Sequence, residues 1–95
     1  MSRREYDISI TFNGMRINKV IIDPHYEIKH TESINDELII ELVKKLDGED
    51  IGADSVDGPY TYFVDELEHN GKLYRLVWLL EDHQIYIGVV NAHRR

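Results

Sequence analysis

The residues best suited to chemistry in this sequence are histidines and arginines at the ends of predicted elements. His25 and His30 flank a short segment before the main predicted helix, and His93 is followed by Arg94 and Arg95. Imidazole titrates near neutrality, so histidine can serve as a general base or a general acid. The guanidinium fork of arginine binds phosphate oxygens in a bidentate manner. These groups suit metal-independent RNA cleavage, in which a base takes the proton of a 2′-hydroxyl and an acid protonates the leaving oxygen.

Arg75 is a charged residue inside an apolar run, Lys72–Leu80. Because strand side chains alternate, Arg75 is expected on the same face as Leu73 and Val77. A guanidinium in that position requires a carboxylate, a carbonyl or a ligand phosphate. Two interpretations follow, namely phosphate binding and a structural salt bridge across the sheet.

The other histidines give weaker signals. His69 and His83 fall in predicted turns, where a surface position is expected. Asp23 could join His25 and His30 in a metal site, but the i, i+5 spacing of the two histidines does not aim both at one ion from a helix. We therefore predict no metal ligands and no cofactor.

The elements that must position these residues are read from apolar alternation and turn signals. Asn13-Gly14 and Asn70-Gly71 are strong hairpin turns. Five strands are expected: Tyr6–Phe12, Arg16–Ile22, Tyr60–Leu67, Lys72–Leu80 and Ile85–Asn91.

Between the first two and the last three strands, apolar residues recur every four positions from Ile34 to Leu46. This pattern predicts an amphipathic helix over Ser33–Leu46, with Ser33 as its N-cap. The order β-β-α-β-β-β predicts an α+β fold, with a mostly antiparallel sheet packed on one main helix and Trp78 or its neighbours in the core.

Composition limits the class of protein. The 95 residues predict a single domain over 1–95. The chain has no cysteine and a net charge of −7, which argues against thiolate chemistry and against a protein that coats nucleic acid. No signal peptide and no apolar run of roughly 20 residues occur, so we expect a cytoplasmic protein that does not enter a membrane.

The acidic residues are concentrated in the middle of the chain. Residues 23–70 carry three basic and fourteen acidic groups, whereas the segments on either side each carry a net charge of +2. Residues 47–59 are predicted to be a long acidic loop, whose Asp spacing does not match a calcium-binding EF-hand. It is interpreted as a solvated linker, or else as a mobile flap or partner contact.

Residues 74–95, YRLVWLLEDHQIYIGVVNAHRR, resemble the C-terminal sheet of RelE/YoeB-type toxins. Those toxins have an arginine-bearing strand, an acidic turn, a second apolar strand and a closing basic or histidine-containing tail. Residues 25–48, HYEIKHTESINDELIIELVKKLDG, resemble the His-containing helix of small domains on the same barnase/RelE-like architecture.

The resemblance implies roles for particular residues. Arg75 is expected to hold the scissile phosphate, and His93 is similar to the C-terminal histidine of the YoeB branch. The acidic base of the family has only loose counterparts in Glu66 and Glu68, and His25 or His30 could fill that role instead. Substrate contacts are expected from the basic residues Lys72, Arg94 and Arg95.

The resemblance implies a RelE-like toxin or toxin-derived, metal-independent ribonuclease, with RNA or the ribosome and an antitoxin protein as partners. The alternative is a non-catalytic module on the same fold that engages a basic partner through its acidic middle. The chain departs from the family in being acidic, in starting with a β-hairpin and in having few lysines.

The register of the last hairpin decides whether this site can form. A two-residue turn would pair Arg75 with Val90 and put His93 on the opposite face, whereas a three-residue turn would pair Arg75 with Val89 and put His93 on the same face. The ribonuclease interpretation needs the three-residue turn or a β-bulge. It further predicts that Arg75, His93 and Arg94 gather with His25 or His30 in one concave patch.

Overall fold

The computed structural model describes residues 3–22 and 34–95. In order, the elements are β1 (Arg4–Phe12), β2 (Met15–Ile22), α2 (Asp36–Lys44), β3 (Ser55–Asp57), β4 (Tyr60–His69), β5 (Lys72–Glu81) and β6 (Tyr86–Arg94). The strands form a single sheet in the order β1-β2-β6-β5-β4-β3. Neighbours are antiparallel except β2 and β6, which run parallel.

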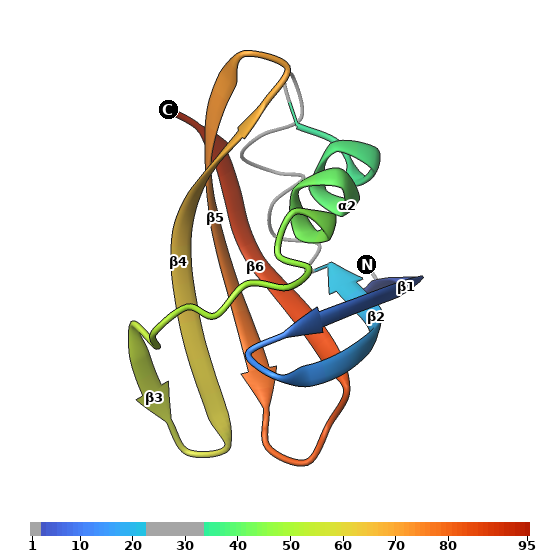
Figure 1. The fold of residues 1–95 in the computed structure, drawn as a ribbon, viewed down its shortest axis with the longest axis vertical. Helices are drawn as coiled ribbons and strands as arrows, with labels where there is room; N and C mark the ends of the chain where they lie inside the picture. The colour runs from blue at the N-terminus through green and yellow to red at the C-terminus, as the bar shows by residue number, and fades with distance from the viewer. Residues whose placement is uncertain (1–2, 23–33) are drawn as a thin grey trace.

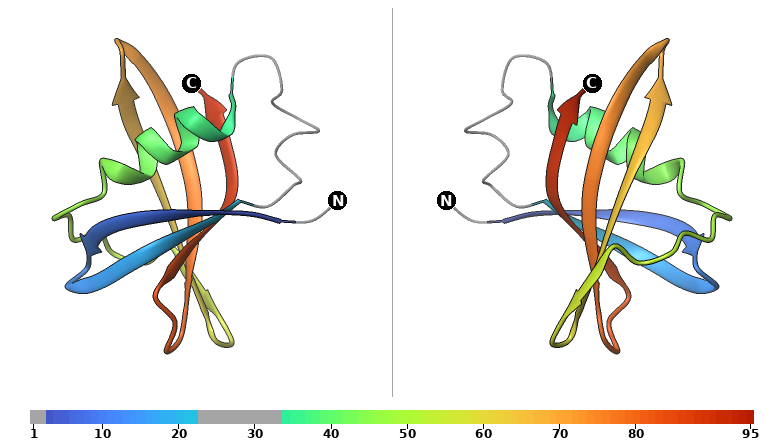
Figure 2. Two further views of the ribbon diagram at one scale, coloured as in Figure 1. Left: turned by 90° about the vertical axis from the view of Figure 1, so that its right-hand side faces the viewer. Right: turned by 90° about the vertical axis from the view of Figure 1, so that its left-hand side faces the viewer.

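The sheet curls strongly, so that the β1–β2 hairpin crosses the long strands β4, β5 and β6 at a steep angle (Figures 1 and 2). Strands make up 60% of the described residues and the helix only 11%, and the whole is a six-stranded half-barrel. The predicted α+β fold, with a sheet packed on one main helix, is therefore wrong. The short helix lies on the concave side, where the curl brings both halves of the sheet around it (Figure 2).

The fold prediction was wrong because it gave the helix too large a part. Helix α2 spans nine residues, and its N-cap is Asn35, whose side chain accepts a hydrogen bond from the backbone N–H of Leu38. The predicted cap, Ser33, lies outside the described residues. An apolar repeat at helical spacing indicates which face is buried, but it does not make a helix the main layer of a fold.

Strand β3 was not predicted from the sequence, and it lies inside the predicted acidic loop. The backbone N–H of Asp54 donates to the carbonyl of Tyr62 at 2.8 Å, and Ser55–Asp57 then pairs with Tyr60–Tyr62. Gly58 and Pro59 make the two-residue turn, with Gly58 at a φ of +61°. Glycine at the first position of a two-residue loop is a hairpin signal, so this strand was readable from the sequence.

The core lies between the helix and the concave face of the sheet. Trp78 is fully buried, as predicted, and helix residues Ile39, Leu42 and Val43 join the same apolar cluster. We call this face of the sheet the inner face and the opposite one the outer face. Both predicted Asn-Gly hairpins are confirmed, with Asn13 and Asn70 at φ of 51° and 52°.

The N-terminal end of the helix is tied to the first strand. Arg4 binds the Asp36 carboxylate through Nε at 2.5 Å and through its terminal nitrogen at 2.9 Å, and the Tyr6 hydroxyl donates to the same carboxylate. A bidentate guanidinium–carboxylate pair fixes orientation as well as distance. This contact sets how the β1–β2 hairpin approaches the helix.

Candidate functional site

The outer face carries the predicted chemistry of β5. Its residues alternate, with Tyr74, Leu76 and Trp78 buried on the inner face and Arg75 partly buried on the outer face. Residues directly opposite each other in antiparallel strands point to the same side of a sheet. The strand register therefore identifies the neighbours of Arg75.

Arg75 stands between an acid and a histidine. It pairs with Glu66 of β4 on one side and with His93 of β6 on the other. The three side chains form one cross-strand row on the outer face, which we call the charged row. Carboxylate, guanidinium and imidazole are the three groups needed to take a proton, hold a phosphate and return a proton.

A β-bulge in β6 creates this row. Trp78 pairs with Val89, but the preceding residue, Val77, pairs with Asn91, so Val90 is an extra residue. Without the bulge, Arg75 would face Ala92 and His93 would turn to the inner face. The loop itself, residues 82–85, is neither the two- nor the three-residue turn considered from the sequence, and both predicted partners of Arg75 are wrong.

The carboxylate of the charged row already has a cation. Arg95 Nε lies 2.8 Å from Glu66 Oε2, and the backbone N–H of Arg95 donates to the Leu73 carbonyl at 2.8 Å. Arg75 itself forms no ion pair with any residue in the described parts of the chain. No carboxylate within residues 3–22 and 34–95 therefore pairs with Arg75, as the interpretation of Arg75 as a salt-bridge residue would require.

The remaining predicted site residues are distributed differently. Arg94 pairs with Tyr74, whose side chain is on the inner face, and Lys72 lies two residues before Tyr74 on the same strand. By register, Arg94 and Lys72 therefore belong to the inner-face side, away from the charged row. Lys72 lines a shallow hollow of about 350 Å³ with Glu37, Glu41 and His69, between the helix and the β4–β5 turn. His25 and His30 lie outside the described residues, as does Asp23.

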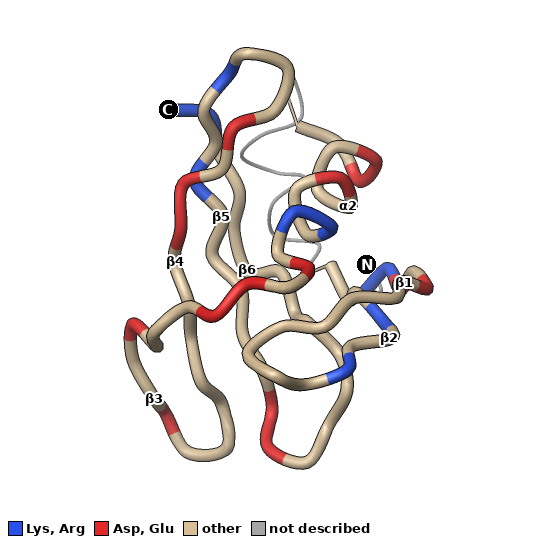
Figure 3. The backbone as a smooth tube through the Cα atoms, in the orientation of Figure 1, with Lys and Arg blue, Asp and Glu red and all other residues tan. Residues whose placement is uncertain are grey.

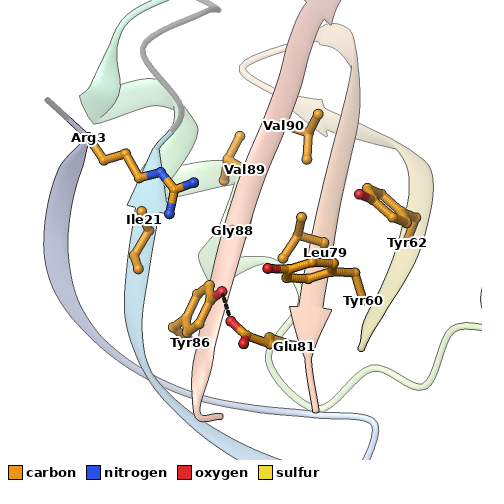
Figure 4. A pocket seen from close by; sticks show the side chains of 10 residues that line it. All are labelled: Arg3, Ile21, Tyr60, Tyr62, Leu79, Glu81, Tyr86, Gly88, Val89 and Val90. Carbon is orange, nitrogen blue, oxygen red and sulfur yellow. Dashed lines mark hydrogen bonds between the residues drawn. The ribbon is translucent and has the colours of Figure 1, made fainter. Parts of the chain in front are cut away.

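The outer face also carries a depression that the sequence analysis did not identify. It measures about 340 Å³ and lies at the opposite end of β5 from the charged row (Figure 4). We call it the aromatic depression; it is lined by Arg3, Ile21, Tyr60, Tyr62, Leu79, Glu81, Tyr86, Gly88, Val89 and Val90. The alternation of Tyr60 and Tyr62, and a glycine inside a predicted strand, were the available signals.

One wall of the aromatic depression is a hydrogen-bonded tyrosine. The Tyr86 hydroxyl donates to Glu81 Oε1 at 2.5 Å (Figure 4). Burial, together with this hydrogen bond, raises the pKa of Tyr86 to about 12. The phenol therefore remains neutral, and its donated proton helps to keep the Glu81 side chain in place.

Gly88 forms the floor of the aromatic depression. A Cβ atom there would lie 3.0 Å from Leu79 Cδ1 and 3.4 Å from Tyr86 Cε2. The absence of a side chain thus lets Leu79 and Tyr86 close over the strand and leaves a shallow, flat base.

Charge is unevenly distributed around these features. Acidic residues follow the upper part of β4, and basic residues lie beside them near the ends of β5 and β6 (Figure 3). Residues 3–22 and 34–95 contain no group of three side chains that could hold a metal ion. Within the same ranges, no helix has the length and apolar character to cross a membrane.

Comparison with known proteins assigns no relative: no protein-family model matches the chain, and neither the curated proteins nor the solved structures contain a significant match.

Proposed function

We propose that the protein is a metal-independent endoribonuclease, a RelE-like toxin or a derivative of one, that cleaves RNA at the charged row. The observation that supports this most is Arg75, a partly buried guanidinium set between Glu66 and His93 with no ion pair among the described residues. A guanidinium held in this way is an anion site, and a phosphodiester supplies the anion. An RNA substrate also favours action in the cytoplasm.

The proposed reaction uses each member of the row once. Glu66 takes the proton of the 2′-hydroxyl, the 2′-oxygen attacks phosphorus, and the bond from phosphorus to the 5′-oxygen breaks. His93 donates a proton to that leaving oxygen, and Arg75 stabilises the charge on the phosphoryl oxygens. The products are a 2′,3′-cyclic phosphate and a 5′-hydroxyl.

Two further residues refine the proposal. Glu68 pairs with Leu73, one row away from Arg75, so Glu66 is the better base. Arg95 keeps the Glu66 side chain beside the row and adds a second positive charge for the phosphate. The partner expected for a toxin is a neutralising protein that covers this face.

Cleavage of a fluorophore-labelled RNA in EDTA tests the proposal. The wild-type protein is expected to release a cyclic phosphate, and Arg75→Gln should lower kcat/KM by roughly 10²–10³-fold, the usual loss on removing one charge-stabilising donor. Arg16→Gln is the matched control, because Arg16 is an exposed arginine on β2 whose partner is Ser9. Equal rates for Arg75→Gln and wild type, or an inert wild-type protein, would refute the assignment.

A second candidate is a binding module for a basic, extended segment, favoured by the open edge of β4. The pairing of β3 ends at Tyr62, whose carbonyl faces outward to Asp54. By strand alternation the backbone groups of Val64, Glu66 and Glu68 also face outward, next to acidic side chains. Induction of the protein alone separates the candidates: a ribonuclease arrests growth and Arg75→Gln relieves the arrest, whereas a binding module accumulates harmlessly.

A further inference from the structure

We propose that the aromatic depression is a nucleobase-binding subsite for the single-stranded RNA that the charged row would cleave. This inference rests on the proposed function for its substrate class, and it adds a site, its residues and the part of the nucleotide that they bind. Its basis is the placement of two tyrosine rings, a guanidinium and a flat apolar floor in one hollow on the same face as the charged row.

The shape of the hollow fits a planar group. Tyr60 and Tyr62 stand along β4 on one side, Arg3 reaches in from the other side, and Gly88 and Leu79 form the base between them (Figure 4). All nucleobases have a π-face, so stacking on tyrosine is tolerant of sequence. The side chains of Leu79 and Tyr86 pack over Gly88, so a planar base would rest on these side chains rather than on the strand backbone.

The charges of the hollow fit a nucleotide better than a purely apolar ligand. Arg3 forms no ion pair with any described residue, so its guanidinium is available for a phosphate oxygen. The nearby carboxylate of Glu81 is engaged by the Tyr86 hydroxyl, which limits its repulsion of an anionic strand. A cation beside aromatic rings is the usual combination for single-stranded nucleic acid.

The position of the hollow links it to the charged row. Tyr62 and Glu66 are four residues apart on β4 and lie on the same face, a separation of about 13 Å at the rise of an extended strand. The cross-strand pair Val64 and Val77 lies between them and carries no charge. One RNA strand can therefore follow β4 and β5 with a base in the hollow and a downstream phosphate at Arg75.

Direct binding of an uncleavable RNA tests this inference. In a 2′-O-methyl oligonucleotide the attacking hydroxyl is blocked, so fluorescence anisotropy reports affinity whether or not the protein is a nuclease. The double variant Tyr60→Leu/Tyr62→Leu should bind roughly tenfold or more weakly, because each base–aromatic stack is lost. Tyr60→Phe/Tyr62→Phe keeps the rings and should bind like wild type. Circular dichroism melts confirm that each variant is folded.

Val56→Ala is the control for a change on the same hairpin. Val56 is 68% exposed and pairs with Thr61, so it lies on the other face of the sheet and its loss should not alter affinity. No binding of the oligonucleotide by wild type, or equal affinity of the Leu and Phe double variants, would overturn the subsite even if RNA is cleaved. If the Leu double variant loses affinity, the Phe double variant does not, and the wild-type protein cleaves no RNA, the base-binding subsite is supported and the ribonuclease proposal is refuted.

Discussion

Arg75 and Tyr86 are polar groups on the same partly buried face of the sheet, but their surroundings differ. Tyr86 has a protein partner, because its hydroxyl donates to Glu81. Arg75 has neighbours in register but no ion pair among the described residues. A polar group that already has a partner contributes to stability, whereas one placed without a partner is available to a ligand.

Tyr86 allows a prediction about alkaline pH. Its pKa is raised from 10.0 to about 12 in the folded state, first by burial and then by the bond to Glu81. The folded protein thus retains a proton that the unfolded chain loses, so this stabilisation is complete below about pH 10 and disappears as the pH rises to about 12. In urea denaturation across this range, Tyr86→Phe should show a smaller fall in the free energy of unfolding than wild type.

The matched control for Tyr86 is Tyr62→Phe. The Tyr62 hydroxyl lies on the same face but makes no hydrogen bond with a described residue. This variant should retain the wild-type dependence on pH. If Tyr86→Phe gives the same alkaline slope as wild type and Tyr62→Phe, burial and the bond to Glu81 do not raise the pKa of Tyr86 in the folded state.

At the scale of elements, the turn of the first hairpin holds the loop that follows the helix. Asn13 donates from its side chain to the Ile51 carbonyl at 3.0 Å and accepts from the Ile51 N–H at 2.7 Å. Its backbone N–H donates to the Glu49 carbonyl at 3.0 Å. The first part of the predicted solvated linker is therefore bound to the β1–β2 hairpin.

Asn13→Gly tests the contribution of this attachment. Glycine accepts the positive φ of the turn, so the hairpin should form, but both side-chain hydrogen bonds to Ile51 are lost. We expect the free energy of unfolding to fall by about 1–3 kcal/mol. Asn70→Gly is a matched control, because Asn70 has the same φ in an Asn-Gly turn and no side-chain bond to a described residue. Equal effects of the two substitutions on the free energy of unfolding would show that the hydrogen bonds to Ile51 do not contribute to stability.

At the scale of the whole molecule, three aromatic rings join distant strands in the core. Phe12 of β1 meets Phe63 of β4 edge-to-face at 5.2 Å and Trp78 of β5 at 5.7 Å. Phe63 and Trp78 pair across their strands and stack at 5.6 Å. These contacts hold the two halves of the curled sheet together, since β1 lies three strands away from β5 in the sheet order.

Phe12→Ala should therefore destabilise the whole domain. Phe12 is fully buried, and truncation of a buried phenylalanine costs about 3–5 kcal/mol. This is a large share of the roughly 5–15 kcal/mol that stabilises a domain. Trp78, the single tryptophan, reports the unfolding by fluorescence. Val56→Ala, at a 68% exposed side chain, should change stability by less than about 0.5 kcal/mol. A loss below about 1 kcal/mol for Phe12→Ala would mean that the rings do not join the two halves.

The sequence by itself determined the local features of this protein. Two Asn-Gly turns and the alternation of apolar residues placed five strands close to their observed positions. Trp78 or its neighbours were expected in the core, and Trp78 is fully buried. These features depend on backbone preferences and on burial of one face, which act over a few residues.

Only the tertiary structure decided how these elements combine. The curl of the sheet and the parallel pairing of β2 with β6 bring together segments that are far apart in the chain. The bulge at Val90 is a property of two paired strands rather than of either one, and it alone determines that His93 shares a face with Arg75. The candidate site was thus predictable in its residue types but not in its geometry, because a shift of one residue in register reverses every side chain.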